Sequence, residues 1–156
     1  ASRRKMMKLT KKQILSYQQN QPPYLMVDFI TKVIPGKLSE GYKKLPKNEW
    51  FFKVHWKNNP NMPGALQFES IVQTCSLALF TLPNNKKKIL YIVEASELKF
   101  YKKVVPGKNL VVKSRILNLI RGVAFCEGKG YQNNVITCSA KFKVILPDEI
   151  KKFKVK

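Results

Sequence analysis

Residues 64–82, GALQFESIVQTCSLALFTL, form a nearly apolar segment that constrains the fold of the 156-residue chain more than any other stretch. Pro63 and Gly64 stand at its beginning and Pro83 follows its end, which are positions where these residues begin and stop helices. The segment is long enough for about five helical turns, and these would be apolar on nearly every face. Because such a helix must be surrounded by protein, we expect a central, buried helix.

Strand patterns follow this segment, and no second long helical period does. They cover residues 89–100, 109–120, 123–131 and 135–146, with turn residues between them. Before the segment, residues 11–18 predict a short helix with Thr10 as its N-cap, and residues 24–33 and 37–44 predict two strands joined at Pro35-Gly36. This order indicates an α+β fold in which an antiparallel sheet wraps a central helix, the hot-dog fold.

The chain shows no internal repeat and no linker, and its 44% hydrophobic content fits one folded domain. We expect a single domain over residues 1–156, with basic tails at residues 1–9 and 147–156. No run approaches the ~18 apolar residues of a membrane span. The basic N-terminus also lacks the apolar core of a secretory signal.

The cysteines are odd in number and widely spaced: Cys75, Cys126 and Cys138. None lies in a Cys-x-x-Cys pair, which indicates reduced thiols rather than a zinc site or a disulfide framework. We therefore expect a cytoplasmic protein with no metal and no cofactor.

The chain is strongly basic, with 30 Lys and Arg against 9 Asp and Glu and a formal net charge of +21. Such a charge suits nucleic acid, an anionic membrane surface or an acidic protein partner. The lysines are spread in pairs and triplets, and RNA-binding signatures are absent. We interpret most of them as solvated side chains, with a subset that binds a partner.

His55 is the only histidine, and Glu69 lies 14 residues further on within the predicted helix. Taken alone, the two residues favour a bland interpretation, in which the loop histidine bonds to backbone and the carboxylate pairs with a lysine. Their surroundings favour chemistry, because the Met62-Pro63-Gly64 step exposes the first N–H groups of the helix, which can hold a carbonyl oxygen. Histidine also exchanges protons near neutral pH. A base, an acid and a carbonyl-binding helix end are what removal of water beside a carbonyl requires.

The segment NEWFFKVHWKNNPNMPGALQFE, residues 48–69, resembles the signature of FabZ-type 3-hydroxyacyl-acyl carrier protein dehydratases, with the His-to-Glu spacing kept. PYLMVD at residues 23–28 is similar to the family's P-F-L-L-V-D, and LKFYKKVVPGKNL at residues 98–110 is similar to its R-P-V-V-P-G-D segment. Residues 121–142 fall where the family has its last hairpin. The similarity covers about residues 11–146. The chain departs from the signature at Val54, Trp56 and Lys57, which bear on the acyl entrance and its charge.

The resemblance implies a role for each matching residue. His55 would remove the α-proton of a 3-hydroxyacyl thioester, Glu69 would help to expel the 3-hydroxyl as water, and the Gly64 N–H would hold the thioester carbonyl. The substrate-binding candidates are Gly64, Met62, Pro63, Phe68 and Phe100.

The resemblance also implies partners. An acidic acyl carrier protein would deliver the substrate, and the lysines near the predicted site that would dock it are Lys57, Lys99, Lys102, Lys103 and Lys108. Relatives pair two chains edge to edge, so that each site takes His from one subunit and Glu from the other, and we expect a homodimer or a trimer of dimers. The alternatives are a hot-dog thioesterase and a non-catalytic module that binds acyl groups or nucleic acid.

Overall fold

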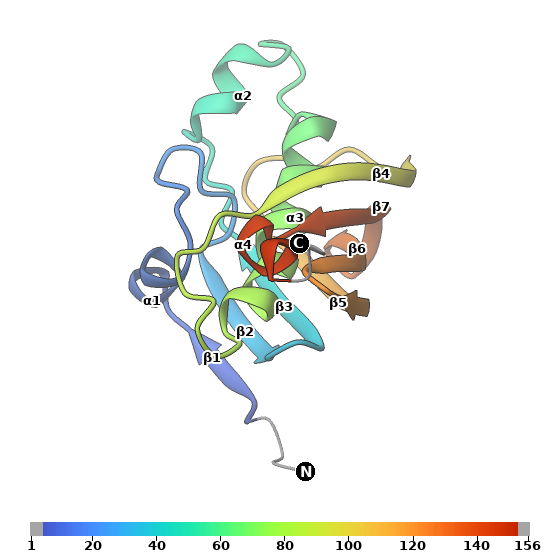
Figure 1. The fold of residues 1–156 in the computed structure, drawn as a ribbon. Coiled ribbons are helices and arrows are strands. Elements are labelled where there is room, and N and C mark those ends of the chain that lie inside the picture. The colour runs from blue at the N-terminus through green and yellow to red at the C-terminus, as the bar shows by residue number, and fades with distance from the viewer. Residues whose placement is uncertain (1–4, 153–156) are drawn as a thin grey trace.

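The strands of the protein pair side by side and antiparallel in a computed structural model that describes residues 5–152. Over these residues, one seven-stranded sheet has the order β1-β2-β3-β5-β6-β7-β4 (Figure 1). The strands are β1 (Met7–Leu9), β2 (Phe29–Ile34), β3 (Leu38–Lys43), β4 (Tyr91–Phe100), β5 (Leu110–Ile120), β6 (Val123–Gln132) and β7 (Val135–Ile145). The short β1 and the long β4 are thus the two edges of the sheet.

The long helix α3 (Gly64–Phe80) lies against one face of this sheet and contacts β2, β3, β5, β6 and β7. Every residue from 70 to 80 is buried, as an all-round apolar helix requires. Gly128 of β6 lets the sheet approach closely, since a Cβ there would lie 2.4 Å from Ile71 of the helix. The predicted α+β hot-dog architecture, with a sheet wrapped around a central helix, is confirmed.

The remaining helices are short: α1 (Lys11–Tyr17), which contacts β1, β2 and α3, α2 (Trp50–Val54) and α4 (Pro147–Lys151). Thr10 is the N-cap of α1, as predicted, and forms a capping box with Gln13. In Figure 1, α2 stands away from the sheet, beyond the beginning of α3.

The predicted strand over residues 24–33 is wrong in its first half, because β2 begins only at Phe29. The backbone of Tyr24 and Met26 bonds to side chains of α3 instead of to a strand. Gln73 accepts from the Met26 N–H at 2.7 Å and donates to the Tyr24 carbonyl at 3.0 Å, while Ser70 donates to the Met26 carbonyl at 2.8 Å. An apolar run is compatible with either arrangement, which is why the pattern misled.

Three other elements differ from the sequence expectation. The predicted basic tails contain structure, since residues 7–9 form β1 and residues 147–151 form α4; residues 1–4 and 153–156 lie outside the described part of the chain. The stretch before His55 is helical, because α2 places two aromatic rings, Phe51 and Phe52, in the core.

Within residues 5–152, no helix has the length and apolar character that crossing a bilayer requires.

Candidate active site

His55 follows directly after α2 and is partly buried. Its Nδ1 lies 3.0 Å from the carbonyl oxygen of Asn61, which can only accept a hydrogen bond. Nδ1 therefore carries the proton and donates it to this bond, which leaves the Nε2 lone pair free to act as a base. The Trp56 ring stacks on the imidazole, with 5.1 Å between the ring centroids and 23° between the planes.

The loop that holds His55 is itself tied to the residues that follow β4. The Met62 N–H donates to the Val104 carbonyl at 2.8 Å, and Lys103 Nζ donates to Asn59 Oδ1 at 3.1 Å. Asn61 closes the loop with a 2.7 Å bond from its Nδ2 to the Asn59 carbonyl. The orientation of the imidazole is thus set by backbone contacts rather than by another ionisable side chain.

Glu69 lies in the second turn of α3 and is partly buried. Its Oε1 accepts a 2.9 Å hydrogen bond from Gln73 Nε2, one helical turn further on. It also neighbours Tyr24, whose pKa is raised by burial, by the negative charge of Glu69 and by a hydrogen bond to it. Together with Gln73, Ser76 and Phe80, Glu69 lines a hollow of about 390 Å³ that runs along α3.

The structure does not bring His55 and Glu69 into contact. Over residues 5–152 no hydrogen bond or ion pair joins the two side chains, and His55 is not among the residues that line the hollow beside Glu69. Each of the two side chains is thus held by its own partners, His55 by the Asn61 carbonyl and Glu69 by Gln73.

The first residues of α3 come together with the end of β4. Pro63 is the N-cap of α3 and forms no side-chain cap bond, so the first N–H groups of the helix are not capped by a side chain. A Cβ on Gly64 would lie 2.9 Å from the Phe100 ring, so the glycine is what allows that ring to lie over the helix end.

The other substrate-binding candidates lie deeper. Met62 is buried in the core, and Phe68 packs edge-on against Phe142 with ring centroids 5.9 Å apart. Pro63, Gly64 and Phe100 thus form an accessible group, whereas Met62 shapes the site from beneath.

The five lysines that were predicted to bind a partner are all exposed: Lys57, Lys99, Lys102, Lys103 and Lys108. Lys99 and Tyr101 border a second hollow of about 520 Å³ on the outer face of the sheet, away from α3. The opposite charges there are partly paired, Glu97 with Lys141 at 3.2 Å and Arg115 with Glu127.

Sequence reasoning missed Asn61, Gln73 and Tyr24. The sequence did contain a signal for Gln73, because it lies four residues after Glu69 and residues four apart are neighbours on the same face of a helix. A signal also existed for Tyr24, which stands where the family motif quoted above has Phe. No sequence signal pointed to Asn61, which acts through its backbone carbonyl.

Comparison with known proteins places this geometry in a class. A family model described as a FabA-like domain matches residues 19–141. A chain of the dehydratase heterocomplex ApeI:P from Xenorhabdus doucetiae superposes with a TM-score of 0.72 at 10% identity, and the match covers 92% of this chain and 97% of that one. The structural likeness supports the hot-dog fold, and the family model places the sequence among FabA-like domains.

Closer sequence relatives give the family. The 3-hydroxyacyl-[acyl-carrier-protein] dehydratase FabZ of Alkaliphilus metalliredigens (strain QYMF) is 37% identical over 128 residues, 81% of this chain and 87% of the relative. The FabZ of Roseiflexus sp. (strain RS-1) is 30% identical over 141 residues, 90% of this chain and 99% of the relative. The chain belongs to the FabZ-type family of 3-hydroxyacyl-[acyl-carrier-protein] dehydratases, which are hydro-lyases.

Proposed function

We propose that the protein removes water from a 3-hydroxyacyl thioester on an acyl carrier protein and releases the trans-2-enoyl thioester. The observation that carries the proposal is the hydrogen bond from His55 Nδ1 to the Asn61 carbonyl, since it presents a free Nε2 as base beside the start of a helix in a chain of this family. The relatives' names supply the substrate class.

The steps follow from the chemistry of the three groups. The thioester carbonyl accepts a hydrogen bond from the Gly64 N–H, which stabilises the charge that develops on its oxygen. His55 Nε2 takes the proton from C2, and the C–H electron pair becomes the double bond between C2 and C3. The bond from C3 to the hydroxyl breaks as the protonated carboxyl form of Glu69 gives that oxygen a proton, and water leaves. His55 is then protonated and Glu69 is ionised, so transfer of one proton from His55 to Glu69 through solvent restores both groups.

The open edge of the sheet supports a site shared between two chains, and within residues 5–152 no hydrogen bond or ion pair ties His55 to Glu69 of the same chain. All ten residues of β4 are exposed, and β4 is the last strand of the sheet. An open, apolar strand edge invites pairing with another strand. Phe100 at the end of β4 lies on Gly64, so a second chain paired at β4 lies near the helix end. We propose a homodimer formed through β4, in which each site takes His55 from one subunit and Glu69 from the other; a trimer of such dimers remains a prediction.

The carrier protein is acidic, and the exposed lysines near β4 and the loop after α2 are its proposed docking groups. Opposite charges raise the encounter rate more than they raise affinity, and salt weakens the effect. Lys103 is the best placed of the five, because its bond to Asn59 connects it to the loop that orients His55.

The first test is an assay of the purified protein with a 3-hydroxyacyl carrier protein, followed by mass spectrometry. We expect loss of one water from the acyl chain, and His55→Ala or Glu69→Gln to lower the rate by about 10²–10⁴-fold while circular dichroism stays unchanged. Release of the free carrier thiol would instead identify a thioesterase, and near-normal activity of either variant would remove that residue from the mechanism.

A second test addresses the shared site. The His55→Ala and Glu69→Gln proteins are mixed under conditions that exchange subunits. A hybrid dimer then contains one site with both native side chains, so activity should reappear that neither variant has alone. A mixture that exchanges subunits, as shown by mass spectrometry, and stays inactive would mean that each site draws both residues from one chain.

A further inference from the structure

The side chain of Gln73 has every polar atom engaged, although it is only 5% exposed. Its Oε1 accepts from the Met26 N–H at 2.7 Å, and its Nε2 donates to the Tyr24 carbonyl at 3.0 Å and to Glu69 Oε1 at 2.9 Å. The amide cannot be turned around, because Met26 N–H requires an acceptor and the Tyr24 carbonyl requires a donor. A donor is therefore held permanently toward Glu69.

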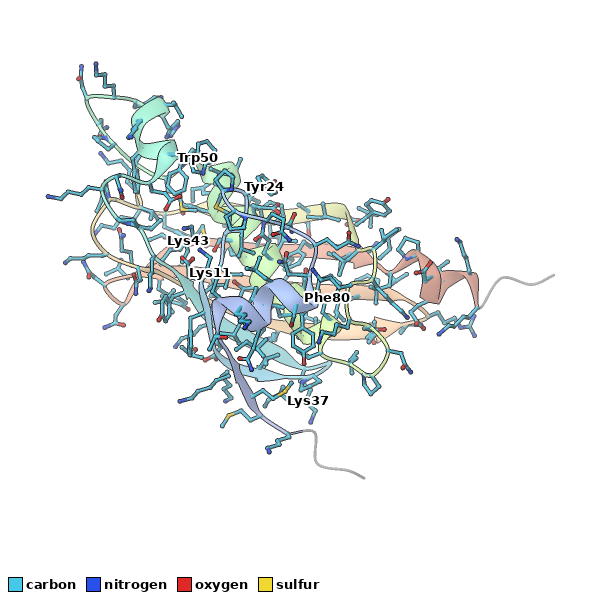
Figure 2. The ribbon with its side chains drawn as sticks, turned by 90° about the vertical axis from the view of Figure 1, so that its left-hand side faces the viewer. Lys11, Tyr24, Lys37, Lys43, Trp50 and Phe80 are labelled. Carbon is cyan, nitrogen blue, oxygen red and sulfur yellow. The ribbon has the colours of Figure 1, made fainter. Side chains whose placement is uncertain are left out.

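The same amide also holds the segment that carries Tyr24. Gln73 bonds to the backbone of Tyr24 and of Met26, and Ser70 bonds to the Met26 carbonyl. Figure 2 shows Tyr24 beside helix α3 and near Trp50, whose indole N–H donates to the Pro23 carbonyl at 3.3 Å. Burial raises the pKa of the Tyr24 phenol, and the negative charge of Glu69 and a hydrogen bond to it raise this pKa further.

We propose that Gln73 and Tyr24 are positioning residues that hold the Glu69 carboxyl group in the orientation from which it acts on the substrate. This inference rests on the proposed dehydration and on the part of Glu69 in it. A glutamate side chain has three rotatable bonds, and the Gln73 donor at 2.9 Å selects among its orientations, with the Tyr24 phenol as a neighbour. The quoted family motif has Phe where this chain has Tyr24.

If Gln73 and Tyr24 position Glu69, their loss should lower kcat and leave KM nearly unchanged, which a purely structural role would not predict. Loss of the Gln73 donor lets the carboxyl group turn away from the reacting hydroxyl while the substrate still binds. We expect Gln73→Met, which preserves length and volume, to lower kcat about 10- to 100-fold with little change in KM, because misplacing a reacting group by about 1 Å has costs of this size. Tyr24→Phe removes one donor and leaves the ring, so we expect a loss of about 3- to 10-fold.

The closing experiment combines kinetics with a direct view of the phenol. Tyrosine labelled with ¹³C at Cζ is followed by NMR across pH, and Tyr24→Phe identifies the Tyr24 signal. In the wild type we expect the pKa of Tyr24 above the ordinary value of about 10. In Glu69→Gln it should fall, because the negative charge is gone, and in Gln73→Met it should fall as well, because the carboxylate is no longer held beside the phenol.

Thr74→Val is the matched control. Thr74 is the next residue of α3, fully buried, and its Oγ1 has no hydrogen-bond partner within residues 5–152. This variant should keep the wild-type kcat and the wild-type pKa of Tyr24.

Two failures can be told apart. If Glu69→Gln retains dehydration, the proposed part of Glu69 is wrong, while the NMR titration still reports whether Gln73 and Tyr24 hold that side chain. If Glu69→Gln is inactive but Gln73→Met keeps its kcat, or if the pKa of Tyr24 is the same in the wild type and in Glu69→Gln, the positioning proposal is overturned.

Discussion

The two edges of the sheet are built in opposite ways. β1 has three residues, and its Leu9 is buried beside α1, so this edge offers little backbone to another chain. β4 has ten residues, every one exposed, with Tyr91, Ile92 and Val93 on its first half. A protein that needed only to avoid unwanted pairing would shorten both edges. The contrast is what the proposed dimer through β4 requires, with one edge too short to pair and the other open.

The largest effect should come from a charge placed on the open edge. Val93→Lys puts a lysine into each of the two β4 strands that would pair, and a charged side chain on an edge strand opposes pairing. We expect monomers in light scattering and a loss of activity of about 10² or more, because each site would lack one of its two reacting side chains.

The control for this change is Met6→Lys, at an exposed residue just before β1. It should alter neither the assembly nor the rate. An active monomer of Val93→Lys would show that the open edge has another purpose, and a monomeric wild type would remove the proposed dimer.

An intermediate effect on kcat/KM is expected when the charge of lysines near β4 is reversed, and none when lysines near β1 are reversed. Lys102→Glu with Lys108→Glu should lower kcat/KM for a carrier-bound substrate about 10-fold at low salt, since electrostatic steering raises association rates by at least that factor. Lys103 is left unchanged, because its bond to Asn59 holds the loop of His55. The effect should shrink at 1 M salt, where the Debye length is ~3 Å rather than the ~10 Å at 0.1 M. A short pantetheine thioester, which docks no protein, should be converted at the normal rate.

The matched control reverses the charge of two exposed lysines near the other edge of the sheet, Lys8 in β1 and Lys37 in the turn between β2 and β3, by Lys8→Glu with Lys37→Glu. Figure 2 shows Lys37 on the far side of the molecule from Trp50. This variant has the same net charge as the docking variant and should keep normal kinetics with both substrates. Equal losses in both variants would mean that total charge, not a docking surface, controls the rate.

The smallest effect concerns the closed edge. Thr10→Ala removes the capping box of α1, which should lower the free energy of unfolding by about 1 kcal/mol. Thermal unfolding measures this, and kcat should not change. Ser16→Ala in the same helix is the control, since it leaves the cap intact; a loss of kcat in Thr10→Ala alone would show that the closed edge also affects the active site.

How far the sequence predicts this fold differs between elements. Helix α3 and strands β4 to β7 were predicted within about two residues of their bounds, because burial on all faces and long β-branched runs are local patterns. β1, α2 and α4 were missed, because elements of three to five residues are too short to show a recognisable periodicity of apolar side chains. Residues 24–28 read as a strand because the pattern indicates apolar burial but does not say which groups satisfy the backbone.

The candidate site divides in the same way. The sequence by itself determined a buried central helix, a sheet of long strands, and a histidine and a glutamate at the spacing of a dehydratase family. Only the tertiary structure decided that the Asn61 carbonyl orients His55, that Gln73 reaches Met26 and Tyr24 across 47 and 49 residues, and that His55 and Glu69 do not meet within one chain. The physical reason is range: side-chain periodicity is set by neighbours in sequence, whereas a hydrogen bond between distant segments exists only once the chain has packed.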